Sequence, residues 1–94
     1  MSIVRYRKRP VVVDTIHYNG TNAQELVAWG VTVQLTVTDD IVIATLESSP
    51  AAQVRHVAQP GDFIIKGVQG EFYPCKASIF KETYELVPSD RPRQ

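Results

Sequence analysis

The chain has 94 residues, of which 44% are hydrophobic and 21% charged, and its formal net charge is zero. This length predicts one small domain with a modest core, and the composition excludes global disorder. No apolar run reaches the ~18 residues of a membrane span, no secretory pattern follows the basic start, and a single cysteine fits a reducing cytoplasm.

The charges are unevenly distributed along the chain. Four bases open it, and the segment from Pro10 to Ser89 carries nine acids against four bases. We therefore expect a basic arm over residues 1–9, one globular domain over 10–88, and a polar tail over 89–94. The arm either solubilises the domain or contacts phosphate or an acidic partner, and the acidic body argues against nucleic acid. The basic residues of the arm are Arg5, Arg7, Lys8 and Arg9.

The first elements are a strand and a short helix. Residues 9–18, "RPVVVDTIHY", are rich in β-branched side chains and predict a strand. Residues 21–30, "TNAQELVAWG", predict a helix capped by Thr21 with Gln24 as its reciprocal partner. Gly30 suits the left-handed position after the helix end.

The middle of the chain predicts a hairpin and an edge strand. Valine and leucine alternate with polar residues over 31–38, "VTVQLTVT", which places one face in the core and one in water. Asp39-Asp40 turns the chain, and 41–47, "IVIATLE", returns antiparallel. A loop over 48–52 then leads to a polar strand over 53–58, "QVRHVA", which we interpret as an edge.

The last third packs several elements closely together. Residues 59–62 fit a type II turn, and residues 63–65 fit a buried strand. Residues 67–70 form the expected tight return, after which residues 71–73 run back as an antiparallel strand. Pro74 lacks an N–H, so this strand either ends there or lies at a sheet edge. Ser78 is the expected cap of a second helix, and 83–87, "TYELV", the expected final strand. The prediction is an α+β domain, with an antiparallel sheet or partly closed barrel of about six strands and two short helices.

The sequence contains three sets of residues whose types could serve metal binding or catalysis. Two histidines and one cysteine without motif spacing do not predict a metal site or a cofactor. Cys75 beside Lys76 is a candidate nucleophile that would need His17 or His56 as base, although such a cysteine is more often a small core residue. Asp62 and Glu71, on either side of Lys66, are a candidate catalytic pair of carboxylates. The simpler interpretation is that Asp62 hydrogen-bonds within its own turn and that Glu71 forms a surface ion pair with Lys66.

The sequence therefore favours surface recognition, which predicts a non-enzymatic protein. Tyrosine and tryptophan are favoured at interfaces, whereas Trp29 and Phe80 more simply fill the layer between helix and sheet. The expected binding surface is the polar and aromatic rim of the last hairpin. Its residues are Lys66, Glu71, Tyr73, Cys75 and Lys76.

Two blocks resemble a family of short proteins from tailed bacteriophages and prophages, many with actinobacterial hosts. The blocks are "YRKRPVVVD" (6–14) and "PGDFIIKGVQGEFYPCKASIFKETYELV" (60–87). Relatives often carry Trp at the position of Phe63 and Pro-Asp at that of Ala77-Ser78. The resemblance implies a phage origin and the cytoplasm of a bacterial host, and it assigns no catalytic residue.

These observations favour a phage-encoded binding module that acts on a host protein or a small signalling molecule in the infected cell. A structural or assembly component of the phage is the alternative, and an enzyme using Cys75 or the Asp62/Glu71 pair is a third hypothesis. An exposed strand edge or an apolar outer sheet face would favour a homodimer.

Overall fold

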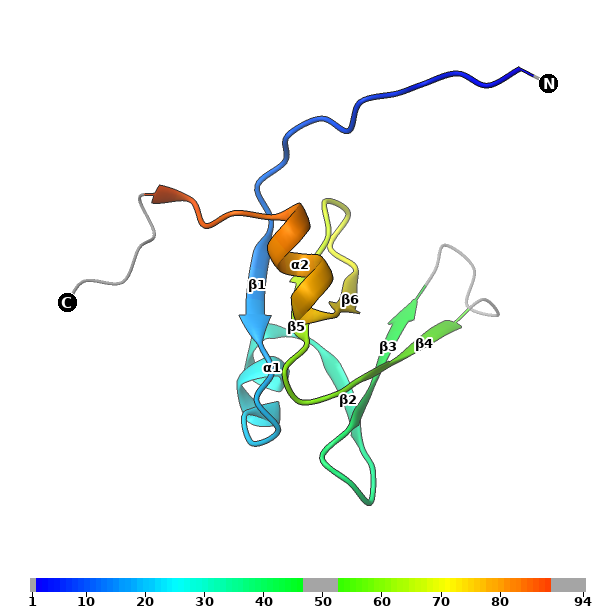
Figure 1. The fold of residues 1–94 in the computed structure, drawn as a ribbon. Helices are drawn as coiled ribbons and strands as arrows, with labels where there is room; N and C mark the ends of the chain where they lie inside the picture. Colours follow the sequence, from blue (N-terminus) through cyan, green and yellow to red (C-terminus); the bar gives the residue numbers. More distant parts are fainter. Residues whose placement is uncertain (1, 47–52, 89–94) are drawn as a thin grey trace.

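The computed structural model describes residues 2–46 and 53–88, and it shows an α+β fold with two antiparallel three-stranded sheets (Figure 1). The predicted α+β class with antiparallel strands and two short helices is confirmed, and the described residues contain six strands, but the sheets are separate and do not close into a barrel. The elements in chain order are β1 (Asp14–His17), α1 (Ala23–Trp29), β2 (Thr32–Leu35), β3 (Ile41–Leu46), β4 (Gln53–Ala58), β5 (Phe63–Lys66), β6 (Phe72–Cys75) and α2 (Ala77–Thr83).

The first sheet has the order β1-β5-β6, with β5 in the centre. Each β5 residue pairs with one residue of β1 and one residue of β6, so that Phe63 lies between His17 and Cys75. The predicted return over 67–70 joins β5 to β6, and Gly70 takes a φ of +85° that favours glycine. Pro74 lies in β6 at the sheet edge, where a missing N–H disrupts no ladder.

The second sheet has the order β2-β3-β4, so the predicted hairpin and the predicted edge strand are both confirmed. The loop between β2 and β3 begins at Thr36, whose hydroxyl donates to the Asp40 carbonyl at 2.7 Å. This hairpin extends beyond the core, and Leu35 and Val37 are therefore exposed although the alternation predicted them inside (Figure 1).

The main core fills the space between the two sheets and α1. Ile64 of β5, Leu26 of α1 and Ile43 of β3 are fully buried there. Trp29 packs at the core margin and meets Phe72 edge-on, with ring centroids 5.0 Å apart. Because strand side chains alternate between faces, Ile65 points to the opposite face of the first sheet, where it is 1% exposed. Helix α2 lies over that outer face (Figure 1).

The turn into β5 is confirmed as predicted. Gly61 has a φ of +99°, and the Asp62 N–H donates to the Gln59 carbonyl at 3.0 Å. A second hydrogen bond joins the same two residues: the carboxylate of Asp62, which is almost fully buried, accepts from the Gln59 N–H at 2.9 Å. Lys76 joins the same carboxylate at 3.2 Å, so the turn is tied to the start of α2.

Both predicted helix caps are wrong. Asn22, not Thr21, is the N-cap of α1, and its amide donates to the His17 carbonyl at 3.0 Å rather than capping the helix. The Thr21 hydroxyl instead donates to the Asn19 side chain at 2.8 Å. Helix α2 begins before Ser78, with Lys76 as its N-cap. Gly30, by contrast, has the predicted left-handed conformation after α1, with a φ of +112°.

Two predicted strands differ from the structure for the same physical reason, the lack of a partner. The first strand is paired only from Asp14, which faces Lys66, because β5 turns away after Lys66. The predicted final strand does not form: α2 continues through Thr83, and residues 84–87 lie outside regular secondary structure. The predicted loop over 48–52 and the predicted tail over 89–94 lie outside the described residues.

Candidate functional site

A groove of about 1310 Å³ lies beside the outer face of the first sheet. Its lining comes from three parts of the chain: residues 8–15, the β5–β6 hairpin, and residues 80–88. We call residues 2–13 the N-terminal segment and residues 84–88 the C-terminal segment. These two segments, which lie at opposite ends of the sequence, cross close to each other above the sheet (Figure 1).

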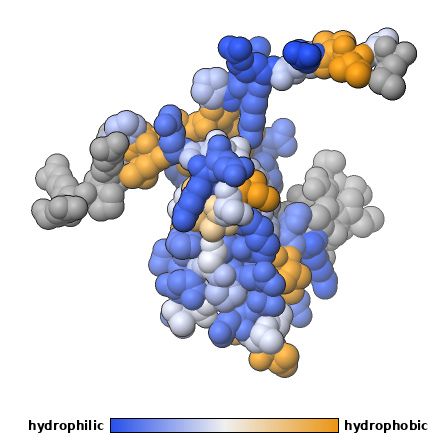
Figure 2. Space-filling model, viewed as in Figure 1, coloured by the Kyte–Doolittle hydropathy of each residue, from blue (hydrophilic) through white to orange (hydrophobic). Residues whose placement is uncertain are grey.

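Apolar side chains dominate both sides of the groove. Val12, in the N-terminal segment, is 76% exposed, and Leu86, in the C-terminal segment, is 58% exposed. Figure 2 shows hydrophobic surface along the C-terminal segment and at the outer end of the N-terminal segment. Exposed aliphatic side chains clustered along a groove are typical of interaction sites.

An aromatic column supports the base of this groove. The Phe63 ring is nearly parallel to His17 and to Phe80, with centroid distances of 4.3 Å and 3.9 Å and interplanar angles of 4° and 5°. At these distances parallel rings must overlap face to face, so Phe63 has one ring on each of its faces. Phe80 in turn stacks on Tyr84 at 4.9 Å, and the column therefore runs from β1 to the C-terminal segment.

The outer end of the column contacts the basic arm. The Lys8 ammonium lies 5.5 Å from the centroid of the Tyr84 ring, within the range of a cation–π interaction. At the other end, His17 Nε2 lies 3.0 Å from the Gly61 carbonyl. Because a carbonyl only accepts, this hydrogen bond requires the proton on Nε2.

Tyr73 lines the groove as an uncharged polar group. Burial, its hydrogen bond with Tyr84 and the nearby charge of Glu71 raise its pKa to about 12. Its hydroxyl therefore stays protonated at neutral pH, where it can donate and accept hydrogen bonds.

The charges along the groove are predominantly negative apart from those of the basic arm. Lys8 and Arg9 belong to that arm and line its end of the groove. The remaining charged lining residues are all acidic and all exposed: Asp14, Glu71, Glu82 and Glu85.

The structure does not gather the five residues of the predicted rim at one place. Glu71 and Tyr73 line the groove. Lys66 lies on the core-facing side of its strand, with its ammonium 5.9 Å from the Phe72 ring centroid. Cys75 and Lys76 lie at the far end of β6, where Lys76 donates to Gln59 at 2.7 Å. Of the basic arm, Lys8 and Arg9 line the groove, and Arg5 and Arg7 lie farther along the exposed arm.

The geometry places the proposed catalytic partners apart. Phe63 separates Cys75 from His17 in the strand register, and His56 belongs to the other sheet. The half-buried Cys75 thiol contacts the Lys76 carbonyl at 3.7 Å. Asp62 and Glu71 lie at opposite ends of the β5–β6 hairpin.

The Glu71 carboxylate is hydrogen-bonded within the return that joins β5 to β6. It accepts a hydrogen bond from the Gln69 N–H at 3.1 Å and folds over Gly67, where it occupies the space that a Cβ would need.

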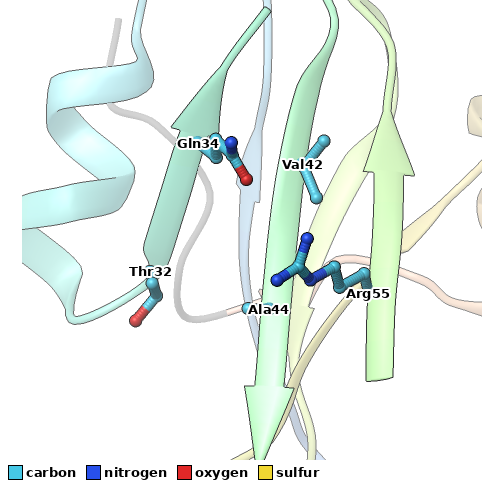
Figure 3. A pocket seen from close by; sticks show the side chains of 5 residues that line it. All are labelled: Thr32, Gln34, Val42, Ala44 and Arg55. Carbon is cyan, nitrogen blue, oxygen red and sulfur yellow. The ribbon is translucent and has the colours of Figure 1, made fainter. Parts of the chain in front are cut away.

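A smaller depression of about 180 Å³ lies on the outer face of the second sheet. The Arg55 side chain extends from β4 across β3 there, and Gln34 reaches toward Val42 (Figure 3). Across residues 2–46 and 53–88, no three His, Cys, Asp or Glu side chains gather as a metal site. None of the helices in these ranges has the length and apolar character of a membrane span.

Sequence reasoning did not identify the C-terminal segment as part of a site. Phe80 and Tyr84 are four residues apart, the spacing at which side chains meet on one helix face. That spacing was the available signal, but the β-branched character of 83–87 indicated a strand instead. Comparisons with protein-family models, with curated proteins and with solved structures give no match.

Proposed function

We propose that this protein is a non-enzymatic binding module that recognises an extended polypeptide segment in the groove between its N- and C-terminal segments. The observation that carries the proposal is the groove itself, about 1310 Å³ in volume and bordered by exposed Val12 and Leu86. The phage resemblance supports a host protein in the bacterial cytoplasm as one source of such a segment.

The outer edge of β1 supports an extended ligand: it has no neighbouring strand in the part of the chain that the structure describes, although its His17 carbonyl already accepts from the Asn22 amide. β1 is an edge strand, so half of its backbone N–H and C=O groups point away from β5. An added strand satisfies such groups through main-chain hydrogen bonds, and neighbouring apolar side chains then supply specificity. The exposed Val11 and Val12 continue from this edge along the groove.

The rigid base of the groove supports binding without large rearrangement. The column of His17, Phe63 and Phe80 fixes α2 against the sheet. Tyr84 extends that column into the groove lining, so one border of the site is held by stacking before any ligand arrives.

A peptide-display selection on the immobilised full chain tests the proposal. We expect selected peptides to bind Leu86→Asp at least ~tenfold more weakly than the wild type, because a carboxylate in the apolar border is desolvated by the ligand. Val57→Asp is the matched control: Val57 is 59% exposed on the second sheet, and this change should leave affinity unaltered. Equal losses in both variants, or no selectable peptide for a chain that is monomeric, would contradict the proposal.

A further inference from the structure

We infer that the groove receives the basic arm of a second copy of this chain, so that two copies exchange their arms reciprocally. This inference rests on the proposed function, because it requires a groove that accepts an extended segment. It specifies the source of that segment and the residues that recognise it.

The arm has the composition of a ligand rather than of a solvated tail. Ile3, Val4 and Tyr6 are 79%, 67% and 92% exposed, which leaves three large apolar side chains in water. Arginine and lysine are interspersed with them, and the hydrophobic outer end is visible in Figure 2. In an extended chain alternate residues face opposite sides, so Val4 and Tyr6 share one side while Arg5 and Arg7 share the other.

The groove is complementary to that pattern. Its apolar border, with Val12 and Leu86, matches the side of the arm that carries Val4 and Tyr6. Glu82 and Glu85 also line the groove and are exposed, so the long side chains of Arg5 and Arg7, on the other side of the arm, can pair with them. The groove therefore offers apolar side chains to one side of the arm and carboxylates to the other.

The course of the chain directs the arm toward another molecule. The N-terminal segment leaves the first sheet and runs away from the domain (Figure 1). Lys8 and Arg9 line the groove of their own chain, whereas the segment before them continues away from it (Figure 1), and Pro10 favours an extended conformation at Arg9. The eight residues 2–9 reach about 26 Å when extended. Two copies that exchange such arms form a closed, two-fold symmetric dimer.

The test is the mass of the full chain by size-exclusion chromatography with light scattering. The wild type should elute at twice the chain mass of 10.5 kDa. Reversing the charge of the groove (Glu82→Lys/Glu85→Lys) or of the arm (Arg5→Glu/Arg7→Glu) should weaken dimerisation at least ~tenfold each. An equimolar mixture of the two variants should recover the dimer, since both arm–groove pairs in the heterodimer are then oppositely charged.

Gln24→Lys/Glu25→Lys is the matched control, because it shifts charge in the same direction on exposed positions of α1 and should leave the dimer intact. A monomeric wild type, a dimer that resists both reversals, or a mixture that stays monomeric would overturn the inference. If the wild type is monomeric yet peptides selected from the display library bind at Leu86, the arm exchange fails and the proposed function survives. If the wild type is monomeric and no peptide binds at Leu86, both the arm exchange and the proposed function fail.

Discussion

Phe63 of β5 and Phe80 of α2 stack face to face, with ring centroids 3.9 Å apart and planes 5° from parallel. This contact joins the central strand of the first sheet to the helix that covers its outer face. Since β5 also carries the fully buried Ile64 on its other face, one four-residue strand organises both layers of the protein. The groove depends on this contact, because α2 leads directly into the C-terminal segment.

Phe80→Ala should therefore loosen α2 selectively. We expect a loss of about 2 kcal/mol in the free energy of unfolding, less than for a fully buried phenylalanine because Phe80 is half-buried. Ile79→Ala, at the 56% exposed neighbour in the same helix, should cost at most about 0.5 kcal/mol. Urea unfolding measures both, and equal losses would show that the stacking contributes nothing specific.

Removing the Asp62 side chain should lower the free energy of unfolding more than removing that of its ion-pair partner, Lys76. Asp62→Ala removes the acceptor of the Gln59 N–H and of Lys76, and should cost about 2 kcal/mol. Lys76→Ala should cost less than about 1 kcal/mol, because the lysine side chain is 52% exposed. Chemical denaturation of both variants and of the double variant measures the coupling. A larger loss for Lys76→Ala would mean that the ion pair, not the turn bond, holds this junction.

Substitution by alanine should reduce the stability of the protein to different extents at the two glycines of the β5–β6 return, Gly67 and Gly70. Gly70 has a φ of +85°, so Gly70→Ala should cost about 1 kcal/mol, whereas Gly70→Asn should cost less because asparagine tolerates this conformation. At Gly67 the three atoms nearest to a new Cβ all belong to the Glu71 side chain, which is flexible and can move away. Thermal unfolding should therefore rank Gly67→Ala as milder than Gly70→Ala, and the reverse order would refute this reading of the turn.

Stability should fall on the alkaline side. The folded pKa of Tyr73 is raised to about 12 from the ordinary 10, so above pH 10 the unfolded chain loses this proton first and is favoured. The free energy of unfolding should decline between about pH 10 and pH 12 and be unaffected by this group below that range. Burial and the charges of Asp39 and Asp40 raise the pKa of Tyr18 as well, which adds to the decline.

Tyr73→Phe should flatten this alkaline decline, as followed by unfolding at a series of pH values. Tyr6→Phe is the control, because Tyr6 is 92% exposed and its substitution should leave the profile unchanged. An identical decline in wild type and Tyr73→Phe would exclude Tyr73 as a source.

Local patterns in the sequence predicted most of the hairpins. The Pro60-Gly61 turn and the return over 67–70 each depend on neighbouring residues, and the structure contains both. The alternation in 31–38 correctly predicted a strand of the hairpin, but Leu35 and Val37 are exposed rather than buried. The extent of the strands was less predictable, because a strand ends where its partner ends. β1 begins only at Asp14 because β5 stops at Lys66.

The C-terminal segment was the main feature that the sequence did not predict. Thr83 and Tyr84 favour β structure, and the backbone at Tyr84 is indeed extended, with a φ of −125° and a ψ of 153°. The Thr83 hydroxyl, however, donates to the Ile79 carbonyl at 2.6 Å, and the Tyr84 ring stacks on Phe80. These contacts attach the segment to α2 instead of a sheet edge. They depend on tertiary packing, which no local pattern encodes.

The most direct test of the groove as a binding site is photo-crosslinking from within it. A photoreactive amino acid at Leu86 of the full chain should crosslink to an extended segment, either residues 2–9 of a second copy or a selected peptide, and mass spectrometry would identify the linked residues. The same group at Val57 should give no such product. Equal crosslinking from both positions, or none from Leu86, would contradict the central claim that this groove recognises a polypeptide.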